Sequence, residues 1–589
     1  MNQLNALSNR VEYYDIDLNR DLRAQEYLIA REEEIVEKLV TAIGNMTGAV
    51  LQQLPALDDA LFTVPLISLI QDPLEFLGGI IGVFFKSEYL DIGLFNTLAT
   101  RILDNIHAFS GITDPENSKK PVIWPTECDL SIEEAVDAYF NGTPIHALLM
   151  TPCPFNIPTE QRYSGHWIIA PPGRGKTTLL HTMFLNDVDE DASIIVIDSK
   201  GDLLDPIKRL DWIKDRLLLI EPTADYAFAL NPLDVSHSSV MHAVNMIEYI
   251  MAGLLDAKFT ALQSTLFRNV VPAIIEAFEQ PTLDTFKTLM VHGLPRELMS
   301  RLNAHSRGFF ENKDTGFHSK TYESTRREIV WRLDYVMTNP IIRTMFSAVQ
   351  TKLDIGKEMD AGKIILINNS KSILTDEGAE FFGRFFIALI VRAAQQRAGK
   401  PAEAKKPCYV YIDECQTVIA KDTRIPTLLD ECRSQKIALI LSHQRSAQLT
   451  APVLDAAANC AIRMANSDDE AKYLADKIRM PPETLRSLPR GSFGTFIRDF
   501  SPPGFVLKVP RYDLAKLPRM TDAEFEAIRA RMKTEFSSGA VAEEAHAVIA
   551  SPSRSRGLSA SEPPAPTEPD RSAEKRGIAP DPGEPSDEW

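Results

Sequence analysis

WIIAPPGRGKTTLLHTMF, residues 167–184, is the stretch of sequence that decides the fold. It places an apolar run of strand length, a loop with two glycines and a helical stretch one after the other. A P-loop, with the pattern G-x-x-x-x-G-K-[ST], requires this context, because backbone N–H groups and a helix amino terminus must point at phosphate oxygens. The stretch therefore predicts a nucleotide-binding domain.

The residues of this loop have distinct predicted roles. Gly173 and Gly175 stand where the backbone must approach phosphate closely without an intervening side chain. Lys176 would reach the β- and γ-phosphates, and Thr177 would place its hydroxyl on Mg²⁺. Ala170 replaces the first glycine of the pattern, which should strain the turn slightly without removing a phosphate contact. The predicted nucleotide-binding residues are Gly173, Arg174, Gly175, Lys176, Thr177 and Thr178.

Short apolar runs rich in Ile and Val alternate with helical stretches from residue 166 onward. The runs are HWIIA (166–170), SIIVID (193–198), RLLLIEP (216–222), KIILINN (363–369), CYVYID (408–413) and KIALILS (436–442). Because they lack the polar alternation of a one-sided strand, they predict a mostly parallel sheet that is buried on both faces. The predicted fold class is α/β, in which ligands bind at the carboxyl ends of the strands.

Polar residues follow two of these strands. KPCYVYIDECQ, residues 406–416, ends its strand in Asp413 and Glu414, which matches a Walker B motif. Asp413 would hold Mg²⁺ together with Thr177, and Glu414 would polarise the attacking water; the alternative is that the acidic pair caps the next helix. Gln444 ends the following strand, where RecA-like ATPases place a γ-phosphate sensor; the alternative is an ordinary polar strand end.

The composition divides the chain into four parts and limits its class. The parts are a helical N-terminal domain (1–145), the nucleotide-binding domain (146–238 and 346–520), an all-α insertion (239–345), and a short helix followed by an acidic, Pro/Ser-rich tail that we expect to be disordered (521–589). The six cysteines form no CxxC pair, which favours a reducing compartment. The net charge of −18 argues against wholesale coating of nucleic acid, but it allows a locally basic pore.

Further motifs accompany the loop and the acidic pair. They are IIVIDSKGDL (194–203), NPLD (231–234) and ECRSQKIALILSHQ (431–444). With this combination the chain resembles the conjugative coupling proteins, the DNA-transfer ATPases of type IV secretion systems, which are allied to the HerA/FtsK branch of hexameric DNA pumps. The resemblance covers roughly residues 150–510, and its most specific element is D-x-K-G-D, residues 198–202.

The resemblance implies a RecA-like P-loop ATPase domain with an all-α insertion between its Walker motifs. It also implies ATP and Mg²⁺ as ligands, a homo-hexameric ring around DNA of any sequence, and a relaxase or secretion-channel proteins as partners. Arg433 matches the position from which family members reach the γ-phosphate of the neighbouring subunit, and Arg463 is the second candidate. A surface salt bridge is the alternative role for either arginine.

Family members often begin with two transmembrane helices, and this sequence shows none. Its most apolar N-terminal region, residues 61–85, is divided by Gln71, Asp72, Pro73 and Glu75 into pieces too short to span a bilayer. We expect a buried helical hairpin there, with peripheral membrane contact as the alternative. The expected location is the cytoplasm, with any attachment to the inner face of the cell membrane made through partners.

Three functions are consistent with these sequence features. The favoured one is an ATP-driven DNA translocase that couples DNA to a secretion channel, with Arg326, Arg327 and Arg332 as candidate DNA contacts, although a solvated helix face is the simpler interpretation of these arginines. The second is a HerA/FtsK-like motor for DNA processing or packaging, which would share nearly every motif. The third is a substrate-recruiting adaptor, which would not need the water-activating carboxylate of Glu414.

Overall fold

In the computed structural model, the predicted loop lies at the carboxyl ends of the strands of one large sheet. The structure describes residues 25–41, apart from 35 and 39, and residues 62–537, apart from 71, 91–94, 116, 224–226, 237–238, 255–259, 421–424 and 502. The tail predicted to be disordered lies outside the described residues from residue 538 onward, as do residues 1–24 and 42–61 of the predicted N-terminal domain.

The sheet has eleven strands within the described residues, in the order β2-β1-β11-β10-β9-β3-β8-β7-β4-β6-β5. They are β1 (Phe62–Pro65), β2 (Pro152–Phe155), β3 (His166–Ile169), β4 (Ser193–Asp198), β5 (Leu217–Ile220), β6 (Ile364–Asn368), β7 (Cys408–Asp413), β8 (Ile437–His443), β9 (Ile462–Ala465), β10 (Ser492–Ile497) and β11 (Phe505–Lys508). The seven from β9 to β5 are parallel, and the other four continue the sheet by antiparallel pairing.

The six strands predicted from apolar runs are confirmed as β3 to β8. Every residue of β3, β4, β5, β7 and β8 is buried, as expected for parallel strands that are covered on both faces. β8 lies between the P-loop strand β3 and the acidic strand β7. The ends of all three therefore meet at one edge, and the predicted α/β, RecA-like P-loop fold is confirmed.

The helical prediction for the N-terminal region is wrong in part. Residues 62–65 form β1, and a single turn and one helix follow them in place of a helical hairpin. β1 pairs with β2, which contains two prolines and lies at the edge of the sheet, where a strand can lack backbone donors on its free side. The N-terminal part is thus joined to the nucleotide-binding domain by shared strands, through β1 and β11.

The remaining N-terminal elements are helices. They are η1 (Leu66–Leu69), α4 (Pro73–Phe84), α5 (Ser87–Leu90), α6 (Asn96–Phe109), η2 (Pro125–Glu127), α7 (Ile132–Phe140) and α8 (Pro144–Leu149). Ser131 and Glu134 form a capping box at the start of α7, and Glu134 also accepts a hydrogen bond of 3.0 Å from Thr484. That bond is a second link between the N-terminal helices and the nucleotide-binding domain.

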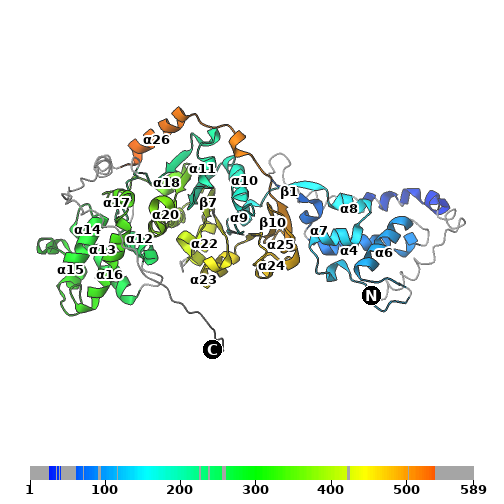
Figure 1. Cartoon of the computed structure of the whole chain (residues 1–589), viewed down its shortest axis with the longest axis horizontal. Helices are drawn as coiled ribbons and strands as arrows, with labels where there is room; N and C mark the ends of the chain where they lie inside the picture. The colour runs from blue at the N-terminus through cyan, green and yellow to red at the C-terminus, as the bar shows by residue number, and fades with distance from the viewer. Residues whose placement is uncertain are drawn as a thin grey trace, which may run out of the picture.

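The insertion lies at the other end of the molecule from the N-terminal helices (Figure 1). The described residues between 239 and 346 form only helices: α12 (Val240–Leu254), α13 (Ala261–Ala277), α14 (Leu283–His292), η4 (Arg296–Arg301), α15 (Ala304–Glu311), α16 (Lys320–Met337) and α17 (Pro340–Phe346). Helix α20 (Asp376–Arg397) packs against α12 and α16 and against α21 (Gln416–Ile419) and α22 (Ile425–Ser434), and so joins the insertion to the nucleotide-binding domain.

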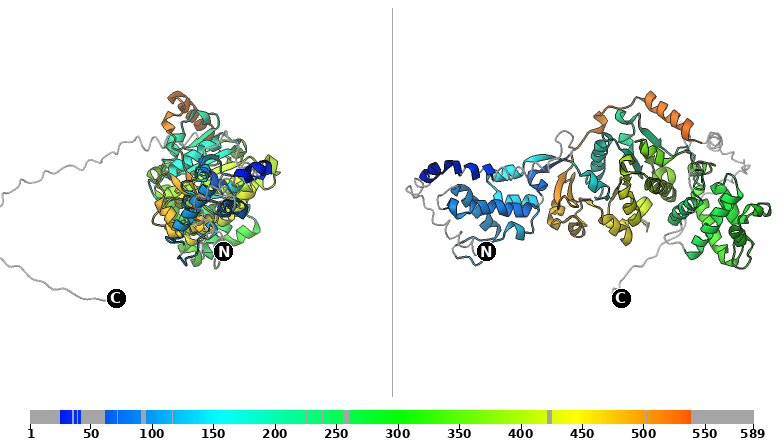
Figure 2. Two further views of the ribbon diagram at one scale, coloured as in Figure 1. Left: turned by 90° about the vertical axis from the view of Figure 1, so that its right-hand side faces the viewer. Right: turned by 180° about the vertical axis from the view of Figure 1, so that it is seen from behind.

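Figure 2 shows the central domain from behind, between the two helical ends. The remaining helices belong to this domain. They are α9 (Thr159–Arg162), α10 (Lys176–Val188), α11 (Leu204–Ile207), η3 (Asp211–Ile213), α18 (Ile355–Asp360), α19 (Lys371–Leu374), η5 (Ala402–Ala404), α21 (Gln416–Ile419), α22 (Ile425–Ser434), η6 (Ser446–Gln448), α23 (Ala451–Ala458), α24 (Ala471–Ile478), α25 (Pro482–Ser487), η7 (Leu514–Lys516) and α26 (Asp522–Phe536). None of the helices in the described ranges is both long and apolar enough to cross a bilayer.

Candidate nucleotide-binding site

The loop between β3 and α10 depends on its glycines. Gly173 has φ of 81° and Gly175 has φ of 105°, a left-handed conformation that residues with a side chain rarely adopt. A Cβ on Gly175 would also lie 3.1 Å from the Cα of Gly491. Glycine is therefore required at position 175 for both backbone conformation and space.

Ala170 fits where the sequence pattern has glycine. Its side chain is buried, its φ is not positive, and its N–H donates a 3.2 Å hydrogen bond to the carbonyl of His443 at the end of β8. The turn after β3 thus needs no glycine, and the departure from the P-loop pattern is local.

Lys176 joins the loop to the acidic pair. It begins α10, is only 8% exposed, and donates hydrogen bonds to Asp413 and, at 3.1 Å, to Glu414 Oε1. Burial lowers the pKa of Lys176, but the negative charges of Asp413 and Glu414 outweigh that effect and raise it above the ordinary value. The ammonium group is therefore charged at neutral pH and is held at the carboxyl edge of the sheet.

Glu414 accepts hydrogen bonds from three further side chains. Its Oε1 accepts hydrogen bonds of 2.6 Å from Lys200 and 2.6 Å from Gln444, and its Oε2 accepts one of 2.7 Å from Gln416. Burial opposes ionisation, but the Lys176 charge and these hydrogen bonds lower the pKa of Glu414 to about 2. The carboxylate is therefore ionised and fixed in direction, and Gln444 lies beside it.

The D-x-K-G-D motif holds Lys200 in this position. The buried Asp198 side chain accepts 2.9 Å hydrogen bonds from the backbone N–H groups of Lys200, Leu203 and Leu204, which fold the loop after β4. Gly201 takes φ of 93° in the same loop. The sequence shows the motif but predicts no role for Lys200, since its contact with Glu414 crosses 214 positions of sequence.

The other predicted residues of the loop surround this centre. Thr177 and Thr178 lie in the first turn of α10, and Asp413 accepts a 2.6 Å hydrogen bond from Ser442, which the sequence analysis missed. Hydroxyl and carboxylate oxygens are the ligands that Mg²⁺ prefers, so Thr177 and Asp413 fit that ion. The guanidinium of Arg174 forms an ion pair with Asp468 and with neither Asp413 nor Glu414.

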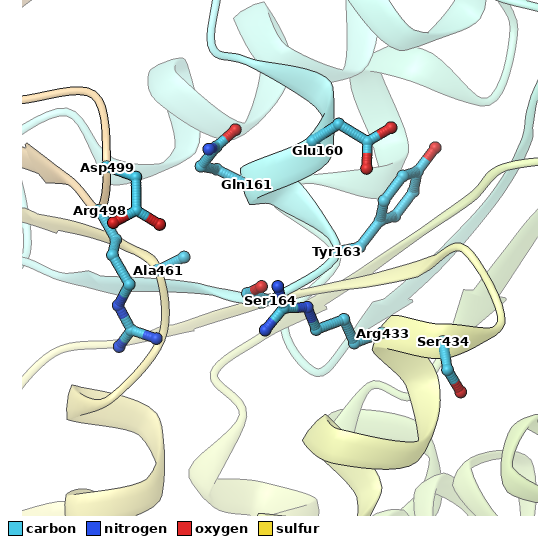
Figure 3. Close-up of a pocket in the computed structure, with 9 residues that line it drawn as sticks. All are labelled: Glu160, Gln161, Tyr163, Ser164, Arg433, Ser434, Ala461, Arg498 and Asp499. Atoms are coloured by element: carbon cyan, nitrogen blue, oxygen red, sulfur yellow. The ribbon is translucent and has the colours of Figure 1, made fainter.

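Arg433 lies far from this edge. It is exposed in the last turn of α22, and its side chain extends toward Ser164 in a pocket of about 350 Å³ (Figure 3). The pocket is lined by Glu160, Gln161, Tyr163, Ser164, Arg433, Ser434, Ala461, Arg498 and Asp499. Ser164 and Ala461 lie one or two residues before β3 and β9, so the pocket opens at the amino ends of the strands. Arg433 is therefore not brought to Glu414 of its own chain.

The other arginines suggested by the sequence form contacts within the fold. Arg463 donates to the carbonyls of Cys460 (3.1 Å) and Lys477 (2.7 Å), and it lies over the Phe496 ring. Arg326 donates to the Met290 carbonyl at 3.2 Å and lies over the ring of Phe317. Arg327 pairs with Glu323, and Arg332 lies over the exposed Trp331 ring.

The sequence matches no protein-family model and no curated protein. The bacterial conjugative coupling protein TrwBdeltaN70, in its unbound form, has a TM-score of 0.46 and 11% identity, over 64% of this chain and 90% of that chain.

Two further solved structures are similar at the same level. The plasmid coupling protein TrwB in complex with ADP and Mg²⁺ has a TM-score of 0.47 and 12% identity, over 63% of this chain and 90% of that chain. VirB4 of Thermoanaerobacter pseudethanolicus has a TM-score of 0.40 and 14% identity, over 59% of this chain and 90% of that chain. The TM-scores of these structures are below 0.5 and their identities are 14% or less, so the function of this chain is judged from its own site.

Proposed function

We propose that this chain is an ATP-hydrolysing DNA translocase of the coupling type, which works as a homo-hexamer and delivers DNA, or a relaxase–DNA complex, to a type IV secretion channel. The observation that carries the proposal is the convergence of Lys176, Glu414 and Lys200 at one carboxyl edge, with Asp413 and Gln444 beside them. A phosphate-binding loop alone would support nucleotide binding only. An ionised, oriented carboxylate next to it supports hydrolysis.

Each residue of the site has a proposed role in hydrolysis. The backbone at Gly173 and Gly175 leaves room for phosphate oxygens, and Lys176 supplies positive charge to the β- and γ-phosphates. Glu414 would orient the attacking water by accepting a hydrogen bond from it. Mg²⁺, held by Thr177 and Asp413, would neutralise part of the phosphate charge. ATP and Mg²⁺ are the proposed ligands.

Strand β8 connects this site to the pocket of Arg433. Arg433 precedes β8 at the amino edge of the sheet, and Gln444 follows β8 at the carboxyl edge, where it contacts Glu414. A displacement of Glu414 would therefore be passed along a buried strand to the opposite edge. In a ring, that edge would face the nucleotide of the next subunit, where Arg433 would stabilise charge on the γ-phosphate.

The test is an ATPase assay with and without single- and double-stranded DNA. Glu414→Gln and Lys176→Ala should each lower kcat by about 100-fold or more, and only Lys176→Ala should weaken ATP binding as well. The matched controls are Glu526→Gln and Lys214→Ala, two surface positions on or beside α26. Equal rates for the wild-type protein and Lys176→Ala under every condition would exclude the ATPase.

A further inference from the structure

The contacts of the site leave the nucleoside half of ATP unassigned. Lys176, Asp413, Glu414 and Gln444 all lie where β3, β7 and β8 end, so the γ-phosphate end of the nucleotide belongs on the β8 side of β3. A triphosphate that crosses the loop in this direction leaves its nucleoside on the other side of β3, toward β9. The chain segments found there are therefore the candidates for recognition of the base.

Sheet topology brings two segments to that side. β9 is parallel to β3, and β10 is antiparallel to β9, so β10 begins at the carboxyl edge. β11 is antiparallel to β10 and ends at the same edge, where Lys508 pairs with Ser492. Residues 488–491, before β10, and residues 509–512, after β11, consequently lie next to the phosphate-binding loop.

Backbone hydrogen bonds fix both segments against the loop and α10. The Gly491 N–H donates to the Arg174 carbonyl at 2.9 Å, and the Val509 N–H donates to the Gly491 carbonyl at 2.9 Å. The Pro510 carbonyl accepts a 3.4 Å hydrogen bond from the Thr182 hydroxyl, one turn along α10 from Thr178. Figure 1 shows the chain leaving β10 and β11 past α10 toward α26.

Tyr512 follows directly after this fixed segment. Its side chain is 40% exposed, and it forms no hydrogen bond or ring contact with another residue that the structure describes. Aromatic rings stack on nucleobases with little regard to base identity, because every base has a π-face. We propose that Tyr512 stacks on the nucleobase of the bound nucleotide and that residues 509–512 carry the base subsite. This assignment rests on the proposed nucleotide-binding function.

The experiment separates base contacts from phosphate contacts. Calorimetry would measure the binding of ATP and of inorganic tripolyphosphate, both with Mg²⁺, to the full-length wild-type protein and to Tyr512→Ala and Tyr512→Phe. Tyr512→Ala should weaken ATP binding by about 5- to 100-fold and leave tripolyphosphate binding unchanged, whereas Tyr512→Phe should retain the affinity for ATP. Tyr335→Ala, at a half-exposed tyrosine of α16, is the matched control and should change neither affinity.

The outcomes that overturn the assignment differ from those that overturn the function. Unchanged ATP affinity in Tyr512→Ala, or an equal loss for ATP and tripolyphosphate, would show that Tyr512 does not recognise the base. Wild-type protein that bound neither ligand would instead refute the nucleotide site itself. Weaker ATP binding in Tyr512→Phe than in the wild type would show that the hydroxyl, and not the ring, makes the contact.

Discussion

Lys200 of the D-x-K-G-D motif contacts the proposed water-activating carboxylate, Glu414. Its ammonium group is half-exposed and donates to the same oxygen of Glu414 as Gln444 does. A hydrogen bond to a charged group contributes about 1.5–3 kcal/mol. Lys200→Ala should therefore lower kcat for ATP hydrolysis by about 10- to 100-fold, with little change in ATP affinity, because Glu414 loses a positioning donor.

Steady-state kinetics on Lys200→Ala and Lys200→Arg would test this role. Arginine keeps the charge and the donors, so it should restore part of the lost kcat. A fall in ATP affinity with unchanged kcat would show that Lys200 acts on the nucleotide and not on Glu414.

His443 makes the stability of the site depend on pH. Its Nε2 accepts a 2.8 Å hydrogen bond from Trp167, its Nδ1–H donates to the Arg445 carbonyl at 2.9 Å, and the ring is fully buried. Burial lowers its pKa to about 4; the bond to Arg445 opposes this shift, the nearby charge of Lys176 adds to it, and the charge of Glu414 opposes it. The folded state is therefore more stable when the His443 ring is neutral than when it is protonated.

The sign of the pH effect follows from that depressed pKa. The stabilisation is complete above the unfolded pKa of about 6.5 and is lost as the pH falls toward 4. Chemical denaturation should show that His443→Gln is less stable than the wild type at pH 7, but loses about 2 kcal/mol less between pH 7 and pH 5. Parallel losses in the two proteins would show that His443 does not titrate in this range.

Single residues of the site were predictable where short spacing fixes them. Gly173, Gly175 and Lys176 follow from one loop, and Glu414 follows from the end of an apolar strand. Ser442 and Lys200 could not be assigned, because their roles depend on which strands become neighbours in the sheet. The sequence shows where a polar residue ends a strand but not which partner it faces.

At the scale of elements, a buried ion pair fastens α9 and α10 to β7. Arg162 forms two hydrogen bonds with Asp187, of 2.5 and 2.7 Å, while Tyr411 donates to Asp187 and the Tyr409 ring lies under the guanidinium. Removing one partner of such a pair leaves a buried charge and costs about 3–5 kcal/mol. Asp187→Ala should lower the free energy of unfolding by that amount.

Chemical denaturation would measure this loss against an exposed pair. Lys406 and Asp191 also form an ion pair, but Asp191 is 90% exposed, so Lys406→Ala should cost no more than about 1 kcal/mol. Similar losses for the two variants would contradict the importance of burial.

The strands also show what sequence pattern can and cannot predict. Six of the seven parallel strands are continuous apolar runs, and the sequence locates these six. The other strands escaped prediction for physical reasons: β9 and β11 are short and each contains a basic residue, β10 contains Ser, Gly and Thr, and β2 contains two prolines. These strands form through pairing with neighbours and not through their own composition.

At the scale of the whole molecule, the proposed hexamer would complete the site of one chain with an arginine of the next. Arg433 lies at the amino edge of the sheet and Glu414 at the carboxyl edge, so in the proposed ring the two would meet across a subunit boundary. Arg433→Ala and Glu414→Gln should each be nearly inactive alone. A mixture should regain ATPase activity, because some boundaries then combine an intact Arg433 with an intact Glu414.

The ATPase rate at increasing ratios of the two variants would measure this recovery. The matched control mixes Arg433→Ala with an Arg433→Ala/Glu414→Gln double variant, which can form no intact boundary. No recovery in the first mixture, with confirmed exchange of subunits, would exclude Arg433 as the residue that acts on the neighbour.

The two helical ends are attached to the central domain in different ways. The N-terminal part continues the sheet through β1, while α12 and α16 of the insertion pack on α20 at the other end (Figure 1). Sequence pattern predicted the helical character of the insertion but not the strands by which the N-terminal part joins the sheet. Such pairing brings together residues as distant as Thr63 and Lys508, which no local pattern shows.

The most direct test of the account is ATP-driven movement on DNA. The assay would follow displacement of a third strand from duplex DNA and of streptavidin from biotinylated single strands, with wild-type protein and Glu414→Gln. The account predicts displacement from at least one substrate by the wild type only, with a strong fall as salt rises, because a motor of this kind grips phosphates. ATP hydrolysis without displacement from either substrate would contradict it.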